Sequence, residues 1–490
     1  MKIQTKNSTI FFFFIILYIM NDKKHNNKEL ALLRNAVNDA SDALGKKIIQ
    51  SENITSIIAI LEKFLKNNST LCYGGTAINN ILPEQDRFYD RNTEIPDYDF
   101  FTPNAITCAK KLADIYYLAG YEEVEAKAGI HTGTYKVYVN FIPIADITYI
   151  DKKTFTNLMK QSIKINGIDY CPPNFLRMAM YLELSRPMGD VSRWEKVLKR
   201  LVLLNKHHPL SGSDCTEVKT ISKYKGPEKN NNNIYNIIKS SVVSQGLVFF
   251  GGYASALYGR YMSSKKKAKI INIPSFDILS TDAESSAIII KEQLIHAGYD
   301  NITVNKRPSI GELILTHYEI MITYNNKTHA LCYIYNASSC HSYNNITIDG
   351  EKLKIASIDT ILSFYLVFIF VDRPYYDVNR LLCMSEYLFK VQMNNRLENN
   401  GLLKRFSINC YGTHVSLEDT RALKSKTYKS LRENKCLRGC KKYDAAFLRY
   451  IPSTEKKLEN LGNKKNTMTK KQSISLSKMK SRNRSNKYKR

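Results

Sequence analysis

The chain has 490 residues, of which 43% are hydrophobic, and it carries a formal net charge of +27 at pH 7. This length exceeds one ordinary core and predicts two to four domains, and the hydrophobic content excludes a largely disordered chain. The excess of 72 Lys and Arg over 45 Asp and Glu indicates a polyanionic partner, since solubility alone rarely needs such an imbalance.

The chain begins with an apolar run, Ile10 to Met20, that follows two lysines. This run is similar to the apolar part of a signal peptide, but it lacks a small-x-small cleavage site and is too short to cross a bilayer as a helix. We interpret Met1 as a misassigned start and Met20 as the true one, so that the part of the run at residues 1–20 that precedes Met20 is not in the mature protein. We expect no membrane segment elsewhere.

Two helices are predicted between residues 27 and 66, where apolar side chains recur near helical spacing. They lead into a Gly-Gly turn that opens a short helix, within the stretch Leu71 to Asn80. Such a turn can bring backbone N–H groups and a hydroxyl against a phosphate, because no Cβ is in the way and the helix N-terminus is positive. Gly74, Gly75 and Thr76 suit this role, and the alternative is an ordinary turn.

An Asp-x-Asp pair follows on a predicted strand, at Asp97 and Asp99. The side-chain period of two places both carboxylates on one face, close enough to share divalent cations. The alternative is a solvated strand face. The apolar residues Tyr98, Phe100 and Phe101 favour a metal site, because a loop of acidic residues would not need them.

The next elements are a helix over residues 104–119, ended by Gly120, and a strand pair over residues 134–150, broken near Pro143. Asp146 lies in an apolar part of that strand pair, and a buried carboxylate without a partner is costly. Asp146 is therefore a candidate third metal ligand. A long helical region over residues 172–204 then presents six cations that either steady a triphosphate or form a solvated face. Trp194, in the same region, is interpreted as a core residue. The six cations are Arg177, Arg186, Arg193, Lys196, Lys199 and Arg200.

A composition break over residues 206–233, with Gly-Pro and four consecutive asparagines at 230–233, predicts a linker or surface loop. Beyond it the chain repeats itself. Gly252 follows Gly75 by 252 − 75 = 177 positions, Asp277 follows Asp99 by 277 − 99 = 178, and Gly298 follows Gly120 by 298 − 120 = 178. Equal offsets indicate a tandem duplication.

The second copy differs where chemistry would need acids. Ser275 stands in the place of Asp97, and the strand region from Ala330 to Ala337 contains no carboxylate to match Asp146. Asp277 alone cannot assemble a two-metal site. The first copy is therefore predicted to be active and the second to keep only the fold.

The 10 cysteines are scattered and mostly lie beside apolar residues, as at Cys72, Cys108 and Cys332. This distribution predicts buried free thiols in a reducing compartment. Only Cys436 and Cys440 are closely spaced, and two thiols in a basic loop are favoured there over a metal site.

The last segments are basic. Residues 392–451 interleave Lys and Arg with tyrosines, as single-stranded nucleic-acid surfaces do, although a solvated face would look the same. Residues 462–490 have the Lys, Ser and Asn composition of a disordered tail.

Gly74-Gly75, Asp97-Tyr98-Asp99 and Asp146 fill the pattern of the nucleotidyltransferase superfamily, whose fold resembles DNA polymerase β. The longer stretches Cys72 to Asn79 and Ile95 to Thr102, with the inactive copy and the basic C-terminal part, resemble the poly(A) polymerase catalytic subunit of large DNA viruses, of the giant-virus and poxvirus type. The resemblance covers roughly residues 27–450.

This resemblance implies an α/β (α+β) architecture of tandem nucleotidyltransferase domains, each a mixed sheet flanked by helices. The expected division is an N-terminal run at 1–20, N-terminal helices and the active domain at 21–205, a linker at 206–233, the degenerate domain at 234–392, a basic segment at 393–461 and a tail at 462–490.

The resemblance also implies the chemistry, which is template-independent addition of AMP from ATP to the 3′ end of viral mRNA. Asp97 and Asp99 would hold two Mg²⁺ (or Mn²⁺) ions, Asp146 would join the metal that activates the RNA 3′-OH, and Gly74, Gly75 and Thr76 would contact the ATP phosphates. It further implies a homodimer located in the host cytoplasm at the viral factory, in the virion, or in both.

Two alternatives remain open at this stage. The same fold serves other terminal transferases, such as uridylyltransferases, and enzymes that modify small molecules. A non-catalytic RNA-binding protein could also carry it, although such a protein would be expected to lose its acids in both copies.

Overall fold

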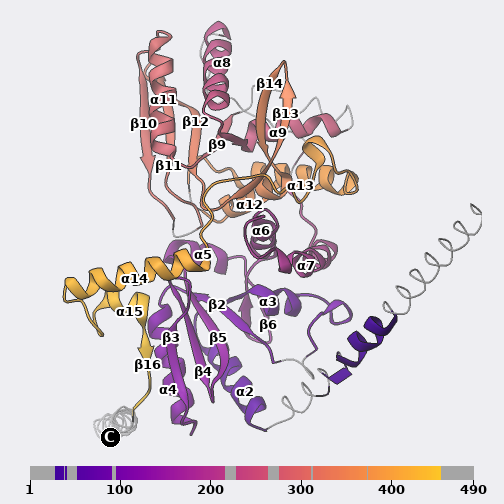
Figure 1. Ribbon diagram of the computed structural model, residues 1–490, viewed down its shortest axis with the longest axis vertical. Coiled ribbons are helices and arrows are strands. Elements are labelled where there is room, and N and C mark those ends of the chain that lie inside the picture. Colours follow the sequence, from indigo (N-terminus) through magenta and orange to yellow (C-terminus); the bar gives the residue numbers. More distant parts are fainter. Residues whose placement is uncertain are drawn as a thin grey trace, which may run out of the picture.

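The computed structural model describes residues 28–37, 39–40, 43, 52–90, 95–213, 215, 228–262, 275–310, 313–371 and 373–453. Two mixed sheets of eight strands each lie at opposite ends of the molecule, with helices packed between them (Figure 1). The apolar run at 10–20 and the tail at 462–490 lie outside the described residues. Within the described ranges, no helix is both long enough and apolar enough for a membrane span.

The first copy begins with the amphipathic helix α2 and continues through a sheet to two helices, α6 and α7. Its elements are α2 (Glu52–Asn67), β1 (Leu71–Tyr73), α3 (Gly74–Ile81), β2 (Tyr98–Thr102), α4 (Ala105–Leu118), β3 (Val124–Ala128), β4 (Thr134–Val139), β5 (Ile142–Tyr149), α5 (Lys152–Met159), β6 (Ile163–Ile165), β7 (Ile168–Tyr170), α6 (Pro173–Leu184) and α7 (Trp194–His207).

The second copy repeats this order, and a C-terminal segment follows it. The elements are α8 (Glu228–Ser244), β8 (Val248–Phe250), α9 (Gly251–Tyr258), β9 (Phe276–Ser280), α11 (Ala283–His296), β10 (Ile302–Arg307), β11 (His317–Tyr324), β12 (Lys327–Asn336), β13 (His341–Ile348), β14 (Glu351–Ala356), α12 (Ile358–Phe368), α13 (Val378–Asn394), β15 (Cys410–Tyr411), α14 (Leu417–Glu433), α15 (Lys441–Phe447) and β16 (Arg449–Tyr450).

The two sheets have the same topology. The first has the order β3-β4-β5-β2-β1-β7-β6 and the second the order β10-β11-β12-β9-β8-β14-β13, and each receives one further edge strand from the C-terminal segment. In both copies the strand that leads into the glycines (β1 or β8) is antiparallel to the strand that carries the second Asp position (β2 or β9). That strand is in turn parallel to its neighbour on the other side (β5 or β12). Even the residue before each Gly-Gly turn agrees, with φ −134° and ψ −170° at Tyr73 against −133° and −168° at Phe250. The predicted tandem duplication is confirmed.

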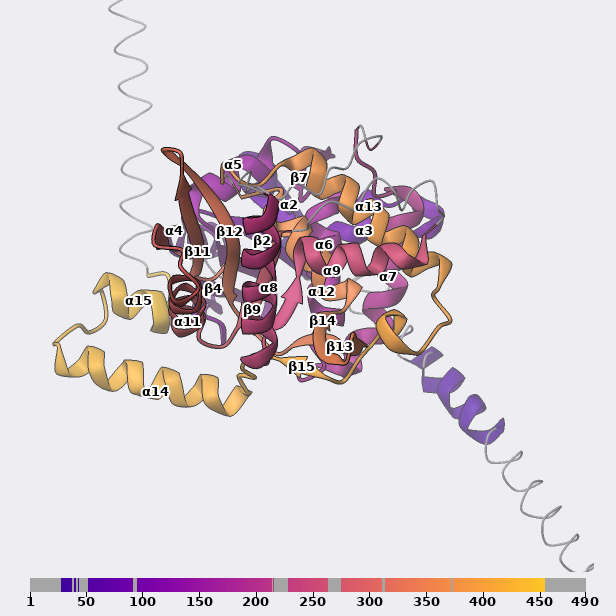
Figure 2. The ribbon, with the colours of Figure 1, turned by 90° about the horizontal axis from the view of Figure 1, so that it is seen from above.

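The helices between the sheets join both copies into one core. Phe175 on α6 packs edge-to-face on Phe370, just beyond α12, at 5.6 Å between ring centroids. The N–H of Ser342 in the second copy donates to the carbonyl of Ser185 in the first at 2.8 Å. Viewed from above, α6, α9 and α12 occupy the centre of the molecule (Figure 2).

The C-terminal segment returns to the first copy. Strand β16 pairs with β3, with Arg449 opposite Lys127. The hydroxyl of Tyr135 on β4 donates to the carbonyl of Ala445 at 2.9 Å. Figure 2 shows α14 and α15 side by side at the edge of the molecule. The segment expected to be a separate basic part therefore completes the first sheet.

Three local predictions differ from the structure. The asparagines at 230–233 lie in α8 and not in a loop. The strands β4 and β5 are joined by a tight turn at Asn140 and Phe141, whose φ angles are 50° and 66°, while Pro143 lies inside β5 where the register shifts. The region 172–204 is two helices, because the chain turns between Ser185 and Asp190 before the short 3-10 helix at Val191–Arg193.

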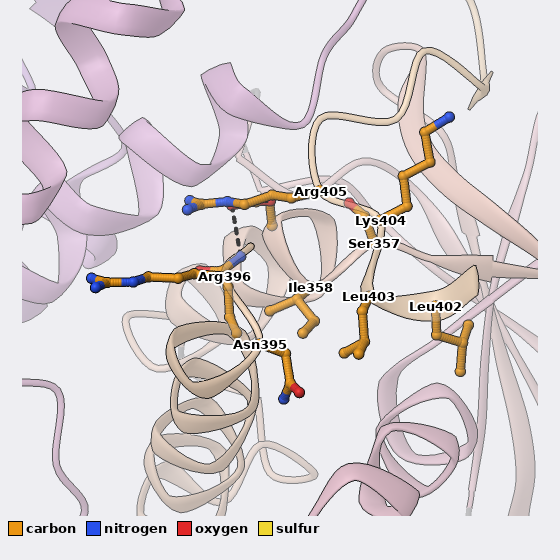
Figure 3. Close-up of a pocket in the computed structure, with 10 residues that line it drawn as sticks. Ser357, Ile358, Asn395, Arg396, Leu402, Leu403, Lys404 and Arg405 are labelled. Atoms are coloured by element: carbon orange, nitrogen blue, oxygen red, sulfur yellow. Dashed lines mark hydrogen bonds and ion pairs between the residues drawn. The ribbon is translucent and has the colours of Figure 1, made fainter. Parts of the chain in front are cut away.

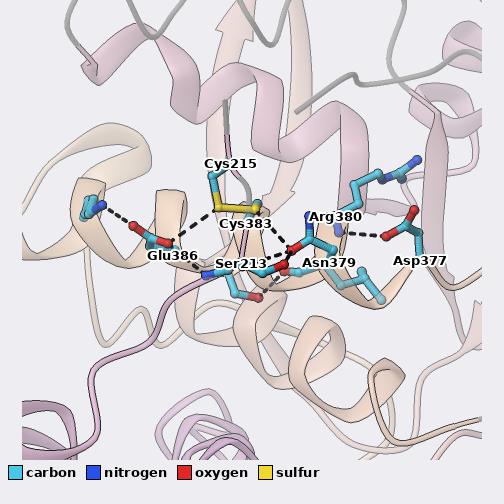
Figure 4. The surroundings of a disulfide bond; sticks show 11 residues. Ser213, Cys215, Asp377, Asn379, Arg380, Cys383 and Glu386 are labelled. Carbon is cyan, nitrogen blue, oxygen red and sulfur yellow. Dashed lines mark hydrogen bonds and ion pairs between the residues drawn. A yellow bond between two sulfur atoms is a disulfide. The ribbon is translucent and has the colours of Figure 1, made fainter. Parts of the chain in front are cut away.

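The cysteine prediction was wrong for six of the 10 residues. Cys215 pairs with Cys383 and Cys340 with Cys410, across 168 and 70 positions of sequence, and Cys436 pairs with Cys440 in a disulfide rather than as two thiols. The first of these joins the segment before α8 to α13, where Glu386 and Asn379 surround it (Figure 4). Sequence spacing did not reveal the long-range pairs because the fold brings them together. Cys72, Cys171 and Cys332 are buried free thiols, as predicted for this kind of position, and Cys108 is half-buried.

Candidate active site

The Gly-Gly turn lies where β1 ends and α3 begins. Gly74 has a φ of +75°, and a Cβ at this position would lie 2.4 Å from the Oδ2 atom of Asp99. A Cβ on Gly75 would lie 2.7 Å from the hydroxyl of Tyr89 and 2.9 Å from a guanidinium nitrogen of Arg200. The left-handed φ and the nearby carboxylate favour glycine at position 74, whereas a Cβ at position 75 would meet the ends of two side chains. The start of α3 therefore lies close to a carboxylate on one side and a cation on the other.

Thr76 performs a different task from the one expected. Its side chain is buried, and its hydroxyl donates to the backbone carbonyl of Asp97 at 2.6 Å. This bond fixes α3 against the segment that carries the first acid. The hydroxyl is therefore engaged within the protein, and contact of the Thr76 backbone N–H with a phosphate remains a prediction.

The three predicted acids lie on neighbouring strands. Asp97 is exposed and directly precedes β2, Asp99 is half-buried within β2, and Asp146 is opposite Asp99 in the parallel pairing of β2 with β5. The side-chain period of a strand turns Asp97 and Asp99 to the same face. The structure thus brings together the residues that the sequence separates by almost fifty positions.

Their charges interact. Partial burial, followed by the charges of Asp97 and Asp146, raises the pKa of Asp99 to about 7. Asp97 is exposed as a residue, but the protein around its carboxylate still removes part of the water there. This desolvation and then the charge of Asp146 raise the pKa of Asp97, whereas Lys136 and Lys196 act in the opposite direction. Negative charge has been concentrated here beyond what the protein's own cations balance, which is typical of a site for a cationic ligand.

Lys136 is the nearest of those cations. It lies directly opposite Asp146 on β4, and its Nζ is 2.5 Å from Oδ2 of Asp146. Partial burial lowers the pKa of Lys136, but the hydrogen bond and the charge of Asp146 outweigh this and raise it overall. The ion pair neutralises one of the three acids.

A second set of cations comes from α7 and the turn before it. The guanidinium of Arg200 donates to the hydroxyl of Tyr89 at 2.5 Å and lies over the Phe88 ring at 4.7 Å. The charges of Lys196 and Arg193 act on Asp97 and Asp99 respectively. Of the helical cations predicted to steady a triphosphate, these three are therefore beside the site.

The other basic residues of that region serve the fold. Arg177 is fully buried, where it donates to the side chain of Asn205 at 2.7 Å and is also hydrogen-bonded to Asn174. Lys199 forms an exposed ion pair with Glu195 one turn away. The Trp194 indole donates to the carbonyl of Glu183 at 3.0 Å and its ring packs against Phe406, in agreement with a core role.

Sequence reasoning missed Lys136, Asn79 and Tyr89. The side-chain oxygen of Asn79 accepts the N–H groups of Phe88 and Tyr89 at 2.8 and 2.9 Å, which holds their loop beside Gly75. Asn79 lies in the Gly-Gly helix, so its position was a usable signal. Lys136 had a weaker signal, since the cross-strand partner of Asp146 depends on a register that Pro143 shifts.

The second copy has the same geometry with other side chains. Asp277 lies opposite Phe250 and Tyr333, as Asp99 lies opposite Tyr73 and Asp146. Tyr333 therefore occupies the position of the third acid. The Oδ2 atom of Asp277 accepts the N–H of Gly252 at 3.4 Å, so a carboxylate caps the helix that a phosphate would otherwise approach.

The donor set of the first copy fits divalent cations such as Mg²⁺, which prefer carboxylate oxygens. Burial, and then the charges of Asp97 and Asp146, raise the pKa of Asp99, and a cation bound there would favour its ionised form. In the described part of the chain, no three His, Cys, Asp or Glu side chains already form a cage for a metal ion. Lys136 is bound to the Oδ2 atom of the Asp146 carboxylate and competes with a cation for that oxygen.

A glycine turn at a helix start, next to acids on adjacent strands of a mixed sheet, is the arrangement predicted for a nucleotidyltransferase. The described part of the chain contains this fold twice, and only the first copy has the three acids. Residues 59–190 match the family model of the poly(A) polymerase catalytic subunit. This match contains Gly74, Asp97, Asp99 and Asp146. The resemblance to the poly(A) polymerase catalytic subunits of large DNA viruses is confirmed.

Individual relatives agree with this family. A protein named as a poly(A) polymerase catalytic subunit in Acanthamoeba polyphaga mimivirus is 23% identical over 431 residues, which cover 79% of this chain and 71% of that relative. A counterpart in African swine fever virus is 28% identical over 171 residues, 34% of this chain and 36% of that protein. The crystal structure of the Megavirus polyadenylate synthase shares the fold with a TM-score of 0.71 at 20% identity, over 90% of this chain and 89% of that one.

Proposed function

We propose that this protein is a template-independent poly(A) polymerase that adds AMP from ATP to the 3′ end of viral mRNA. The observation that carries the proposal is the convergence of Asp97, Asp99 and Asp146 beside the Gly-Gly turn, within the residues that match the poly(A) polymerase family. A fold that had become a passive RNA-binding module would have no need of three mutually repelling carboxylates.

The mechanism follows from the residues of the first copy. Asp97, Asp99 and Asp146 would hold two divalent cations, Mg²⁺ or Mn²⁺, which would supply Lewis-acid stabilisation of negative charge on the phosphates and on the attacking hydroxyl. The backbone N–H groups at Gly74 and Gly75, at the N-terminus of α3, would donate to the triphosphate, and the guanidinium of Arg200 beside Gly75 favours the same anion. The carboxyl of Asp99 must lose its proton before it can bind a cation, which its raised pKa delays until near neutral pH.

A primer-extension assay tests this function. The full chain is incubated with a labelled RNA primer, Mg²⁺ and either each of the four nucleoside triphosphates or an equal mixture of them. We expect extension with ATP, selection of ATP from the mixture, and no extension by Asp97→Ala. Extension with UTP in preference to ATP would make the protein a uridylyltransferase, and no extension with any nucleotide would contradict a transferase function.

The C-terminal segment supplies part of the RNA surface in this proposal. Helix α14 lies beside β3 of the first copy, where Lys424 donates to the carbonyl of Gly129 at 2.5 Å. The exposed Tyr428 on the same helix offers a ring for base stacking. The exposed cations of α14, α15 and the loop between them are Arg421, Lys426, Lys429, Arg432, Lys435, Arg438, Lys441 and Lys442.

Not every basic residue predicted for this surface is available. A hollow of about 300 Å³ lies between the start of α12, the end of α13 and the segment 402–405 (Figure 3). Arg405 extends into it but forms an ion pair with the buried Asp359 at 3.0 Å, so it stabilises the fold. Arg396 and Lys404, which point to different sides in Figure 3, remain candidates for contact with phosphates.

Assembly and location complete the proposal. We infer from the family resemblance that the protein acts as a homodimer, and the exposed apolar side chains of Leu417 and Leu423 on α14 offer a surface for contact. Its proposed location is the viral factory in the host cytoplasm, the virion, or both. Light scattering of the purified full chain tests the dimer.

A further inference from the structure

The second copy contains a hollow in the place of the active site. It encloses about 420 Å³, counting space open to solvent, and is lined by Ser275, Asp277 and Tyr333. Two of these residues, Asp277 and Tyr333, hold the register positions of Asp99 and Asp146. The loss of the acids has therefore not filled the site but has left a cavity of different chemistry.

Aromatic rings form most of its wall. Tyr333, Tyr335, Tyr365 and Phe368 are buried, and Tyr375 and Tyr376 are half-buried at the hollow's edge. Tyr375 stacks on Tyr333 at 5.1 Å between centroids, and Tyr376 stacks on Phe368 at 4.2 Å.

Hydrogen bonds fix the orientation of the two outer rings. The hydroxyls of Tyr376 and Tyr335 are 2.9 Å apart, and that of Tyr375 is 2.6 Å from Nε2 of His317. Rings held in this way lose little entropy when a planar ligand stacks on them, so the wall is organised before a ligand arrives.

One cation and two carboxylates complete the lining. Arg380 lies in the first turn of α13, and no carboxylate within the described part of the chain pairs with its guanidinium. In Figure 4 its side chain extends away from the nearby disulfide, while its backbone N–H is bound by Asp377 at 2.8 Å. Asp277 and Asp377 can accept hydrogen bonds from amino or hydroxyl groups but repel a highly charged phosphate chain.

We propose that this hollow binds one nucleotide unit, with its base against the tyrosines and its single phosphate at Arg380. The chemistry is that of a nucleoside monophosphate, supplied either by a residue of an RNA strand or by free AMP. A triphosphate is disfavoured, because Asp277 caps the helix N-terminus at Gly252 and only one acid remains for a cation. The RNA source rests on the proposed function, and the second copy then holds the strand that the first copy extends.

Crosslinking and binding measurements test this site. The probes are a labelled 15-nucleotide oligo(A) with one 8-azidoadenosine and, separately, AMP and 8-azidoadenosine 5′-monophosphate. The protein is the full chain with Asp97→Asn and Asp99→Asn, in chelator, so that cation-dependent binding in the first copy is removed. We expect crosslinks on the peptide that contains Tyr375 and Tyr376. Because stacking on one aromatic ring is worth about 1–3 kcal/mol, Tyr375→Leu should weaken oligo(A) binding about five- to hundredfold.

Two further variants distinguish loss of this binding site from a general loss of folding. Arg380→Ala, at the edge of the hollow, should weaken AMP binding but leave adenosine binding unaltered, which a general loss of folding would not do. Tyr324→Leu, at a hairpin tip on β11, is the matched control and should bind as the parent does. Crosslinks confined to the first copy, with oligo(A) and AMP affinities unchanged in Tyr375→Leu and Arg380→Ala, would overturn the site. In that case primer extension would be unaffected and the proposed function would stand. Conversely, a protein that does not extend the primer but is crosslinked at Tyr375 would overturn the proposed function and leave the nucleotide site intact.

Discussion

The two copies share one backbone and differ in the charges placed on it. Gly74 and Gly251 have φ angles of +75° and +66°, and a Cβ on either would lie 2.4 Å or 2.1 Å from the carboxylate of Asp99 or Asp277. The contact between the glycine turn and the second Asp is therefore a feature of the fold as well as of the chemistry. Asp97 and Asp146 are the acids that the first copy has and the second lacks, so they separate the copy proposed to be active from the other.

The two copies also differ in the strand that pairs with the strand of the third acid, which is β4 in the first copy and β11 in the second. Asp146 faces Lys136 across the β4–β5 pair, whereas Tyr333 faces Glu319 across β11–β12. Glu319 is buried and forms its ion pair with Arg307 at 2.7 Å. The second copy has thus replaced both members of the acid–lysine pair, and the charge of Glu319 is balanced by Arg307 instead.

The largest expected effect distinguishes Asp99 from Asp277, which make the same contact with a glycine turn in the two copies. Asp99→Asn should reduce primer extension at least about a thousandfold, because a ligand for the reacting centre's cations is lost. Asp277→Asn removes the same contact with a glycine turn and should remain active. The two purified variants are compared in single-nucleotide addition with Mg²⁺ and ATP. An Asp277→Asn variant as inactive as Asp99→Asn would reverse the assignment of the copies.

A smaller effect is expected at the cation that opposes the third acid. Lys136→Met removes a positive charge that competes with a metal ion for Asp146, and half-exposed ion pairs are worth up to about 1 kcal/mol. The Mg²⁺ concentration for half-maximal extension should therefore fall about two- to fivefold.

Its matched control is Glu319→Gln, which breaks the equivalent strand's ion pair in the second copy and should not shift the Mg²⁺ requirement. An increased requirement in Lys136→Met would mean that Lys136 contacts the nucleotide and not only Asp146.

The smallest effect concerns pH. The pKa of Asp99 is raised from 3.8 to about 7 in the folded protein, so the folded state holds a proton there that the unfolded state has lost. This group's contribution to stability is present below about pH 4 and is lost as the pH rises towards 7.

Thermal unfolding in the presence of a chelator measures whether this contribution to stability falls as the pH rises. The melting temperature of the wild type, relative to that of Asp99→Asn, should fall between pH 5 and pH 7, and Mg²⁺ should oppose the fall. A difference that is constant over this range would show that the pKa of Asp99 is not raised into it in the folded protein.

Local sequence was sufficient for much of the site. A glycine pair after an apolar strand, and two aspartates two residues apart on the next, express rules that act over a few residues, so Gly74, Asp97 and Asp99 were found without the fold. Asp146 was found from its apolar neighbours. The roles of Thr76 and Arg177 were not predictable in the same way, because a hydroxyl or a guanidinium serves the core or a ligand according to what packs beside it.

The sequence by itself determined that the fold occurs twice and that only the first copy has three acids, since both facts are matters of residue identity and spacing. Only the tertiary structure decided which side chains face those positions: Lys136 against Asp146, Arg200 beside Gly75, and Tyr333 in a hollow of tyrosines. It also decided the disulfides that join Cys215 to Cys383 and Cys340 to Cys410. The physical reason is that these contacts depend on strand register and helix packing between residues far apart in the chain, which no local pattern encodes.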